Sequence, residues 1–288
     1  MCVGEILADM IMDGESGVIK TYVGGAPFNV AVSASRSGSE VTFLGRLGDD
    51  PIGKFLKKQA EKFPLNLNLQ IDDLSPTTMA FVSVDETGER DFKFLRHDSA
   101  DYKIVVEKEF LEEIKPNIVH IGSLMLSEEV GRKTALDIVR ECKERNIKVS
   151  FDVNYREDVF YKSPDAMRVC LEIIESADIV KFGIEEAEIV YREPFETVLE
   201  KLNNPIVCVT CGKDGSIVKF GKEKILAPTV AVKPVDTTGA GDAFFGAFLS
   251  GVDKVGFESV DKGSLYEIAV FANAKGAEAT LHEGAVVL

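Results

Sequence analysis

The sequence has no excess of positive charge and no long apolar run. Its 288 residues include 33 lysines and arginines but 48 aspartates and glutamates, which gives a net charge of −15. Because nucleic-acid phosphates require a basic surface, this balance argues against a nucleic-acid partner. No run of 18 or more apolar residues and no secretory leader pattern is present. We therefore expect no membrane association and a cytoplasmic location.

Cysteine and histidine are also sparse, and neither has the spacing of a metal site. The five cysteines are odd in number and scattered, as expected for reduced thiols. Cys208 and Cys211 have C-x-x-C spacing, but residues three apart in a strand point to opposite faces, and no second pair completes a zinc site. We interpret both as structural thiols. The three histidines are dispersed, and His120 is predicted to be a half-buried strand residue.

Strand-like and helix-like segments alternate along most of the chain. Strand-like runs at residues 41–47, 117–121, 147–153 and 179–182 are each followed by a helix-like segment, at 52–63, 128–145, 165–176 and 185–191. This alternation predicts a parallel sheet flanked by helices. A last helix is expected at 265–281. No linker divides the chain, so we expect one domain over residues 1–288.

Two regions break the alternation. Residues 16–23 and 77–95 have the pattern of strands joined by turns, including a turn at 85–89. Adjacent strands with no intervening helix cannot belong to the alternating core. We therefore predict a small separate sheet, inserted at about residues 10–24 and 76–97.

The segment at residues 236–242, with the sequence DTTGAGD, runs directly into an apolar stretch. Free backbone N–H groups and the helix dipole make a helix start an anion site, and Gly239 and Gly241 let phosphate oxygens approach the backbone. We predict that Gly239, Ala240 and Gly241 form an anion hole. Asp242 then lies beside the transferred phosphate, where it can act as general base. An ordinary N-cap aspartate is the alternative.

Two glycine patterns in the sequence do not fit the standard nucleotide-binding motifs that they approach. Residues 48–55, GDDPIGKF, nearly match the phosphate-loop pattern, but Phe55 replaces the required Ser or Thr and Pro51 removes an amide. A turn followed by a helix start at Pro51 is predicted instead. The GAG of residues 239–241 lacks the third glycine of the dinucleotide-binding pattern, because Phe244 stands there.

A second helix-opening glycine pair lies at residues 24–29, GGAPFN. Together with residues 236–242, it resembles the two signatures of the PfkB carbohydrate kinase family, the ribokinase-like sugar and nucleoside kinases, over nearly the whole chain. Within that family the motifs GEILAD at 4–9, FLRHDSAD at 94–101 and FDVNYR at 151–156 are closest to those of fructokinases. The resemblance implies a ribokinase-like three-layer αβα sandwich with a mainly parallel central sheet. The small sheet would be a lid over the sugar, which in some members also joins a homodimer.

The resemblance also implies the reaction and its residues. It implies transfer of the γ-phosphate of ATP, with Mg²⁺, to a primary hydroxyl of a small sugar, most closely fructose. The residues implied for sugar binding are Asp9, Gly24, Gly25, Asn29, Arg96, Arg156 and Asp242. Those implied for nucleotide binding are Asn154, Lys181, Thr210, Gly212, Gly215, Gly239, Gly241 and Asn273.

Two further motifs concern metal ions. Residues 181–186, KFGIEE, occupy the place of the family's Asn-x-x-Glu motif, in which Glu186 matches and Gly183 replaces the Asn. By resemblance Glu186 acts indirectly on Mg²⁺, and we expect the lost amide to weaken the enzyme only modestly. Asp236 and Thr238 match positions that help to hold a monovalent cation, usually K⁺, in several relatives. A solvated helix-face acid and a capping aspartate are the respective alternatives.

Other functions stay open at this point. A 2-keto-3-deoxygluconate kinase shares the architecture, but its acidic substrate calls for extra cationic or tyrosine contacts near the lid. A nucleoside kinase is less favoured, because no extra aromatic residues surround Asn29 to stack a base. A sugar-binding regulator without catalysis is the alternative from a different class, and Gly183 keeps it open. For the single residues, ordinary caps, turn glycines and surface arginines are the competing interpretations.

Overall fold

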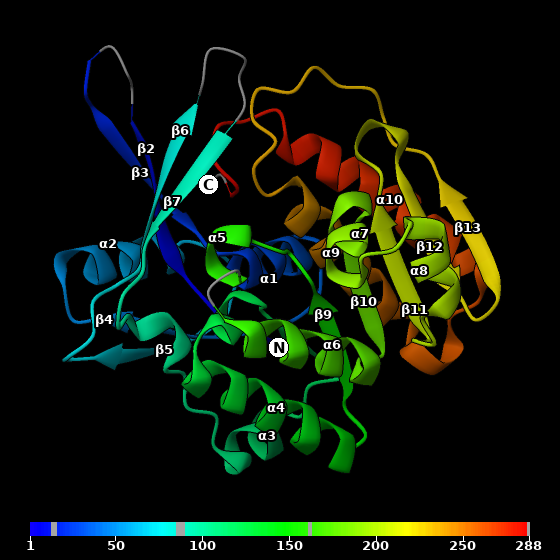
Figure 1. Ribbon diagram of the computed structural model, residues 1–288, viewed down its shortest axis with the longest axis horizontal. Coiled ribbons are helices and arrows are strands. Elements are labelled where there is room, and N and C mark those ends of the chain that lie inside the picture. The colour runs from blue at the N-terminus through cyan, green and yellow to red at the C-terminus, as the bar shows by residue number, and fades with distance from the viewer. Residues whose placement is uncertain (13–15, 85–89, 161–162, 287–288) are drawn as a thin grey trace.

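The computed structural model describes residues 1–12, 16–84, 90–160 and 163–286, and two sheets organise them (Figure 1). The turn predicted at 85–89 lies outside the described residues. The large sheet has nine strands in the order β13-β12-β11-β10-β9-β8-β1-β4-β5. Their bounds are β1 (Cys2–Val3), β4 (Thr42–Gly48), β5 (Asn66–Asp72), β8 (Ile118–Ile121), β9 (Lys148–Asp152), β10 (Ile179–Gly183), β11 (Ile206–Thr210), β12 (Ser216–Phe220) and β13 (Glu223–Ala227).

The large sheet is parallel from β5 through to β11, and β12 and β13 extend it in antiparallel pairing. From β1 the chain moves to β4 and β5 on one side, whereas β8, β9, β10 and β11 follow in order on the other. The strand order therefore reverses between β1 and β8. In open α/β sheets, the crevice outside the carboxyl ends of the strands at such a reversal is where ligands bind.

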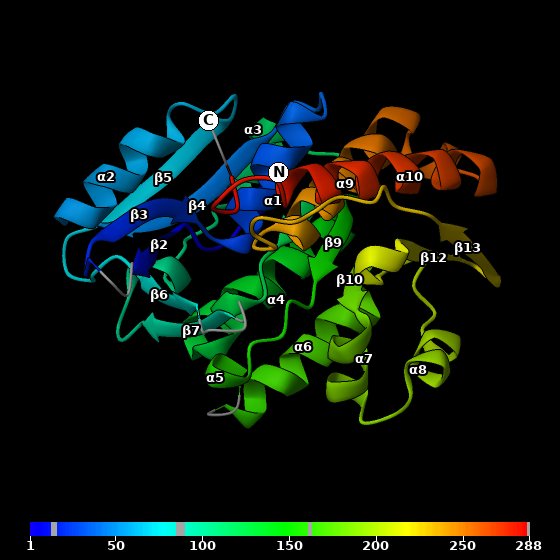
Figure 2. The ribbon, with the colours of Figure 1, turned by 90° about the horizontal axis from the view of Figure 1, so that it is seen from above.

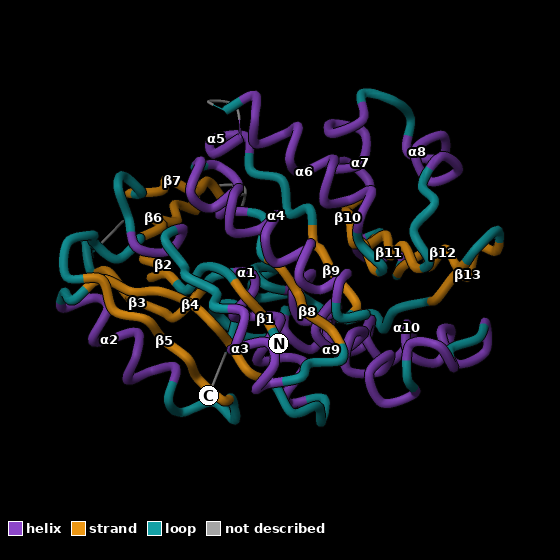
Figure 3. Tube along the Cα trace, turned by 90° about the horizontal axis from the view of Figure 1, so that it is seen from below, coloured by secondary structure: helices purple, strands orange, loops and turns teal. Residues whose placement is uncertain are grey.

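Helices cover both faces of the large sheet (Figures 2 and 3). One face carries α1 (Ala26–Arg36), α2 (Pro51–Ala60), α9 (Ala240–Val255) and α10 (Lys262–Ala279). The other carries α3 (Lys108–Ile114), α4 (Glu129–Glu144), α6 (Pro164–Ser176), α7 (Ile184–Tyr191) and α8 (Phe195–Lys201). Short helices are α5 (Glu157–Phe160), η1 (Ala100–Tyr102), η2 (Leu124–Ser127), η3 (Gly212–Asp214) and η4 (Phe257–Ser259).

Alternating strand residues supply the two cores between these layers. Cys2 is buried with α1 and α9, whereas its neighbour Val3 is buried in the opposite core. This alternation follows from the twofold side-chain period of a strand. The predicted three-layer αβα sandwich is confirmed.

The second sheet has four strands in the order β3-β2-β6-β7. They are β2 (Leu7–Met12), β3 (Ile19–Gly24), β6 (Met79–Val84) and β7 (Arg90–Leu95), and they stand to one side of the large sheet (Figure 1). Leu7, Ala80 and Leu124 form a small core that attaches this sheet to η2. The small separate sheet predicted from the sequence is confirmed.

Local contacts explain where α2 begins. The side chain of Asp50 caps the helix, because its Oδ1 accepts a hydrogen bond from Gly53 N at 2.7 Å and its Oδ2 accepts one from Thr77 N at 2.7 Å. Pro51 occupies the first helical position, where no backbone donor is needed. The near-match to a phosphate loop is thus a helix start, as predicted.

None of the helices in the described part of the chain combines the length and the apolar composition that a membrane span requires.

Candidate active site

The turn before α9 has a backbone that only glycine can follow without strain. Gly239 is the N-cap of α9 and lies in the left-handed region, with φ at 75°. A Cβ atom built at this residue would lie 2.6 Å from the Cβ of Ala285, which is closer than side chains approach. The turn therefore brings bare backbone to the start of a 16-residue helix, where N–H groups have no helical acceptor.

Two cavities meet at this turn. Thr238, Gly239 and Asp242 line the smaller pocket, whereas Thr237, Ala240 and Gly241 line the larger cavity. The turn thus forms a shared wall between the two. A group bound in one cavity would face a group bound in the other across the first residues of α9, where Ala240 N donates to the carbonyl oxygen of Thr237 at 3.2 Å.

The smaller pocket lies at the carboxyl ends of the large sheet, beneath the small sheet. It brings together most of the residues predicted for the sugar, namely Asp9, Gly25, Asn29, Arg156 and Asp242. It also contains residues that the sequence analysis did not assign, namely Glu5, Leu7, Ala26, Phe94 and Leu124. Leu7, Phe94 and Leu124 belong to the contact between the small sheet and η2. Since both sheets contribute, the pocket exists only when they are docked.

Asp242 is held by one direct contact inside this pocket. Asn29 Nδ2 donates a hydrogen bond of 2.8 Å to Asp242 Oδ2, and this bond fixes the direction of the carboxylate. Burial raises the pKa of Asp242, and the hydrogen bond from Asn29 and the charges of Lys181 and Arg156 counteract it. A carboxylate with a raised pKa is a better proton acceptor. Within the described part of the chain, the Oδ1 of Asn29 is buried without a hydrogen-bond partner, so a ligand could donate to it.

Gly24 and Gly25 act on the pocket in different ways. A Cβ atom on Gly24 would lie 2.0 Å from Asp9 Oδ2, so Gly24 makes room for the Asp9 carboxylate and does not itself line the pocket. Gly25 is the N-cap of α1 with φ at 111°, and a Cβ atom there would lie 2.4 Å from the carbonyl oxygen of Glu5. Both glycines are therefore required by close packing at this end of the sheet.

The two arginines predicted for the sugar lie in different surroundings. Arg156 lines the smaller pocket. Arg96 lines neither cavity; its Nε donates a 2.8 Å hydrogen bond to Asp101 Oδ2, and its guanidinium lies 4.8 Å from the centre of the Tyr102 ring. In this structure Arg96 anchors the chain that leaves β7.

The larger cavity, of about 690 Å³, collects residues predicted for the nucleotide. Thr210, Gly212, Gly215, Gly241 and Asn273 line it, together with the apolar residues Val230, Val232, Pro234, Phe244 and Ala277. Ligand cavities of this size are typically apolar with a few polar groups at fixed places. Asn273 is one of those groups, although its Nδ2 also donates to the carbonyl oxygen of Ala227 at 3.0 Å.

Lys181 and Asn154 lie apart from the larger cavity. Lys181 Nζ donates to both carboxylate oxygens of Asp152, at 2.9 and 2.8 Å, in a buried ion pair. Burial lowers the pKa of Lys181, but the charges of Asp152 and Glu186 outweigh this effect and raise it, so the lysine is a cation. A Cβ atom on Gly241 would lie 3.2 Å from its Nζ, which places the ammonium directly behind the anion-binding turn. Asn154, with φ at 35°, lines the smaller pocket.

The two carboxylates predicted for metal ions make backbone contacts. Glu186 Oε2 accepts from Gly183 N at 2.6 Å and its Oε1 accepts from Tyr155 N at 3.0 Å. Asp236 Oδ1 accepts from Thr238 N at 2.7 Å and its Oδ2 accepts from Gly284 N at 2.7 Å. Each carboxylate thus fixes a turn of the site. Among the described residues, no group of three or more His, Cys, Asp or Glu could hold a metal ion.

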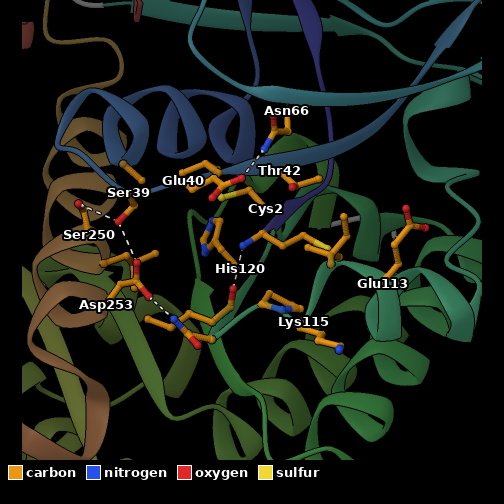
Figure 4. A pocket seen from close by; sticks show the side chains of 18 residues that line it. Cys2, Ser39, Glu40, Thr42, Asn66, Glu113, Lys115, His120, Ser250 and Asp253 are labelled. Atoms are coloured by element: carbon orange, nitrogen blue, oxygen red, sulfur yellow. Dashed lines mark hydrogen bonds between the residues drawn. The ribbon is translucent and has the colours of Figure 1, made fainter.

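A third cavity lies at the amino ends of the strands and has no predicted site residue in its lining (Figure 4). His120 of β8 lies in it, more deeply buried than the sequence indicated, with its Nδ1 2.9 Å from Ser150 Oγ and its ring against Phe245. Burial lowers the pKa of His120 to about 3, so the imidazole is uncharged. We assign this cavity no part in the chemistry.

Comparison with known proteins agrees with this geometry. The family model of the pfkB family carbohydrate kinases matches residues 1–287. The chain belongs to the PfkB family of carbohydrate kinases. It is therefore a sugar phosphotransferase, and the resemblance inferred from the motifs is confirmed.

Individual relatives cover the same length. The chain is 34% identical to the Arabidopsis thaliana protein called Probable fructokinase-5, over 98% of this chain and 91% of that one. It is 33% identical to an ATP-dependent 6-phosphofructokinase of Thermoanaerobacterium thermosaccharolyticum, over 88% of this chain and 81% of that one. The crystal structure of the Vibrio cholerae O395 fructokinase, bound to fructose, ADP and calcium ion, is 31% identical and superposes with a TM-score of 0.88 over 98% of this chain and 92% of that one.

Proposed function

We propose that this protein is a fructokinase that transfers the γ-phosphate of ATP to a primary hydroxyl of fructose. The observation that carries the proposal is the shared wall between the two cavities: Asp242 and Gly239 face the polar pocket, and Gly241 faces the larger cavity. Phosphoryl transfer needs an acceptor hydroxyl and a donor phosphate in line, with little covalent help from the protein. A glycine-containing turn at a helix start between the two supplies backbone amides where this reaction requires them.

In the proposed reaction, Asp242 accepts the proton of the sugar hydroxyl while that oxygen bonds to the γ-phosphorus. The bond between the γ-phosphorus and the oxygen that bridges it to the β-phosphorus breaks, and the bridging oxygen leaves as part of ADP. The amides of residues 239–241 stabilise the charge on the phosphoryl group, and each such donor is worth about 3–4 kcal/mol. Lys181, fixed by Asp152 behind Gly241, adds positive charge on the same side.

Charge in the smaller pocket favours an uncharged sugar. Among the described residues, the ionisable groups that line it are the carboxyls of Glu5, Asp9 and Asp242 and one cation, Arg156. An acceptor that already bears phosphate or carboxylate needs several cations to offset its charge. This charge balance supports fructose over the sugar phosphate used by a 6-phosphofructokinase and over 2-keto-3-deoxygluconate.

Divalent and monovalent cations have separate places in the proposal. Glu186 already accepts two backbone hydrogen bonds, so Mg²⁺ would be held mainly by phosphate and water oxygens, with Glu186 acting indirectly. When bound, Mg²⁺ neutralises phosphate charge during transfer. Asp236 and Thr238 stay our candidates for a K⁺ site, and a comparison of turnover in KCl and NaCl tests it.

The test is an ADP-release assay with Mg-ATP against fructose, fructose 6-phosphate, 2-keto-3-deoxygluconate, ribose and adenosine. A response to fructose, with a phosphomonoester on a primary carbon by ³¹P NMR, supports the proposal. Faster ADP release with one of the other acceptors would identify that acceptor, and not fructose, as the preferred substrate. If the protein binds fructose but releases no ADP with any acceptor, the sugar-binding regulator is favoured. If fructose is neither bound nor phosphorylated, the proposal is contradicted.

A further inference from the structure

Glu5 lies at the point where the strand order of the large sheet reverses. Glu5 is the second residue after β1, and Gly122 follows β8 directly, so both stand at the carboxyl ends of the two strands that flank the reversal. A Cβ atom on Gly122 would lie 2.8 Å from Glu5 Oε2. The backbone at this place is therefore shaped around the Glu5 carboxyl group, and ligands bind at such reversals in α/β sheets.

One oxygen of this carboxyl group has no partner. Glu5 is 2% exposed, and its Oε2 is buried with no hydrogen bond within the described residues. Leaving a buried polar atom unpaired is costly, and native proteins rarely do so without a reason. Glu5 lines the smaller pocket with Asp9, Asn29 and Asp242. The missing partner is therefore expected to enter with the ligand of that pocket.

The surroundings of Glu5 favour its uncharged form. Burial raises the pKa of Glu5 to about 7, and a hydrogen bond from its own backbone N–H counteracts this. Asp101 and Asp242 raise the pKa further, and Arg96 lowers it. The charged residues around Glu5, counting those that share its pocket, are Asp101 of η1, Arg96 after β7, Asp242 of α9, Asp9 of β2 and Arg156 before α5. Carboxylates outnumber cations, so a proton on Glu5 relieves repulsion.

We propose that Glu5 is a sugar-binding residue that keeps its proton in the complex and donates a hydrogen bond from its carboxyl group to an oxygen of the sugar. The inference rests on the proposed function, because it takes the smaller pocket as the sugar site. Of the other groups there, the carboxylates of Asp9 and Asp242 and the Oδ1 of Asn29 are acceptors, whereas Arg156 and the amide of Asn154 can donate. A sugar hydroxyl both donates and accepts, so it can accept from a protonated Glu5, whose Oε2 is buried without a partner among the described residues, while it donates to one of these acceptors.

Calorimetry of fructose binding to the whole protein tests the inference, with Glu5→Gln and Glu5→Leu beside the wild type. We expect the Kd of the wild type to rise roughly tenfold between pH 6.5 and 8.5, as Glu5 loses its proton. Glu5→Gln keeps a donor that cannot ionise, so its Kd should not follow this rise. Glu5→Leu should bind at least tenfold more weakly than Glu5→Gln at both pH values. Glu278→Gln, an exposed change on α10, should follow the wild type.

Proton uptake gives a second reading of the same experiment. At pH 8, fructose binding to the wild type should take up protons, seen as a binding enthalpy that depends on the buffer, and Glu5→Gln should lose most of this dependence. Parallel pH profiles in the wild type and Glu5→Gln would overturn the inference. So would a Glu5→Leu variant that binds fructose as tightly as the wild type, or a Glu5→Gln variant as weak as Glu5→Leu.

A sugar-free measurement separates this inference from the proposed function. Because folding raises the pKa of Glu5, the unfolding free energy of the wild type should fall relative to Glu5→Gln as pH rises from about 4.5 to about 7, and the difference should level off above that. If the unfolding free energy falls in this way but fructose does not bind, the fructose assignment is contradicted and the inference about Glu5 is not. The calorimetry is then repeated with the acceptor that the ADP-release assay selects. If the difference in unfolding free energy between the wild type and Glu5→Gln does not change with pH, Glu5 is not protonated in the folded protein, and the inference is contradicted for any sugar.

Discussion

The two cavities on either side of the turn before α9 are lined by different types of residue. Charged and polar side chains line the smaller pocket, including Asp9, Asn29, Arg156 and Asp242. Glycines and small or apolar side chains dominate the lining of the larger cavity. The first can recognise a polyol, whose hydroxyls need donors and acceptors in fixed directions. The second suits a flat apolar base and a phosphate chain that is met by backbone amides.

This difference predicts how the two cavities respond to substitution. Exchange of a side chain in the smaller pocket removes a specific contact and should change the chemistry or the sugar affinity. Exchange in the larger cavity removes a little apolar surface and should have a small effect. The turn before α9 depends on the shape of its backbone, and the Lys181–Asp152 pair beside it depends on buried charge. Substitutions at either place should therefore first lower the free energy of unfolding.

Replacement of Asp242 by Asn should have the largest effect. The variant keeps the shape of the side chain but cannot accept the proton, so kcat should fall by about 10³-fold, within the range of 10²–10⁴ typical for a general base. The Kd values for sugar and nucleotide should stay close to those of the wild type. Steady-state kinetics and calorimetry measure both, with Asp253→Asn at the other end of α9 as control. Turnover of Asp242→Asn within tenfold of the wild type would contradict the assignment.

Removal of one partner from the buried ion pair should come next. Asp152→Leu leaves the Lys181 ammonium buried without its partner and should lower the free energy of unfolding by about 3 kcal/mol. The double variant Asp152→Leu with Lys181→Met removes both charges and should recover most of that loss. Urea denaturation measures all of these, and Asp165→Asn in the exposed pair with Arg168 is the control. A double variant no more stable than Asp152→Leu would show that the charges do not set the cost.

The same contrast explains how far the sequence could be interpreted. Asp9, Asn29 and Asp242 could be named from the sequence, because they lie in motifs that resemble those of the PfkB family, and all three line the smaller pocket. Their roles stay predictions. The apolar lining of the larger cavity could not be named, because Val230 and Val232 lie in a segment without regular structure and carry no chemical signal. Glu5 stood in a motif that was noticed, but only the fold shows that its Oε2 is buried without a partner.

The fold followed the same rule. Most strands and helices with strong periodicity were predicted, and α10 begins three residues before the predicted start because the Asp261 side chain accepts from Ser264 N at 2.8 Å. Strands β12 and β13 were not predicted, since antiparallel edge strands add no alternation with helices. Helix α3 is seven residues long, too short to show a clear period. The contacts of Arg96 with Asp101 and Tyr102 depend on packing between distant segments.

Substitution of the turn glycine should have a smaller effect on stability than loss of the ion pair. Gly239→Ala forces a Cβ atom to within 2.6 Å of Ala285 Cβ in a left-handed conformation, and should cost about 2 kcal/mol of unfolding free energy. Gly212→Ala is the matched control, because its φ is 56° but no atom lies within 4 Å of the new Cβ. That variant should lose only about 1 kcal/mol, from backbone strain alone. Equal losses by urea denaturation would mean that the contact with Ala285 is not limiting.

The smallest effect should come from the apolar wall of the larger cavity. Val232 is 39% exposed and lines this cavity, so a bound base would cover it. Val232→Ala removes two methyl groups, only part of whose surface a ligand can bury, and about 1 kcal/mol of binding corresponds to a roughly fivefold rise in the KM for ATP. The KM for fructose and kcat should not change, because Val232 does not line the smaller pocket. Leu226→Ala, an exposed change on β13 outside the cavity, is the control. A shift in the KM for fructose instead would mean that the two cavities are not as separate as their linings imply.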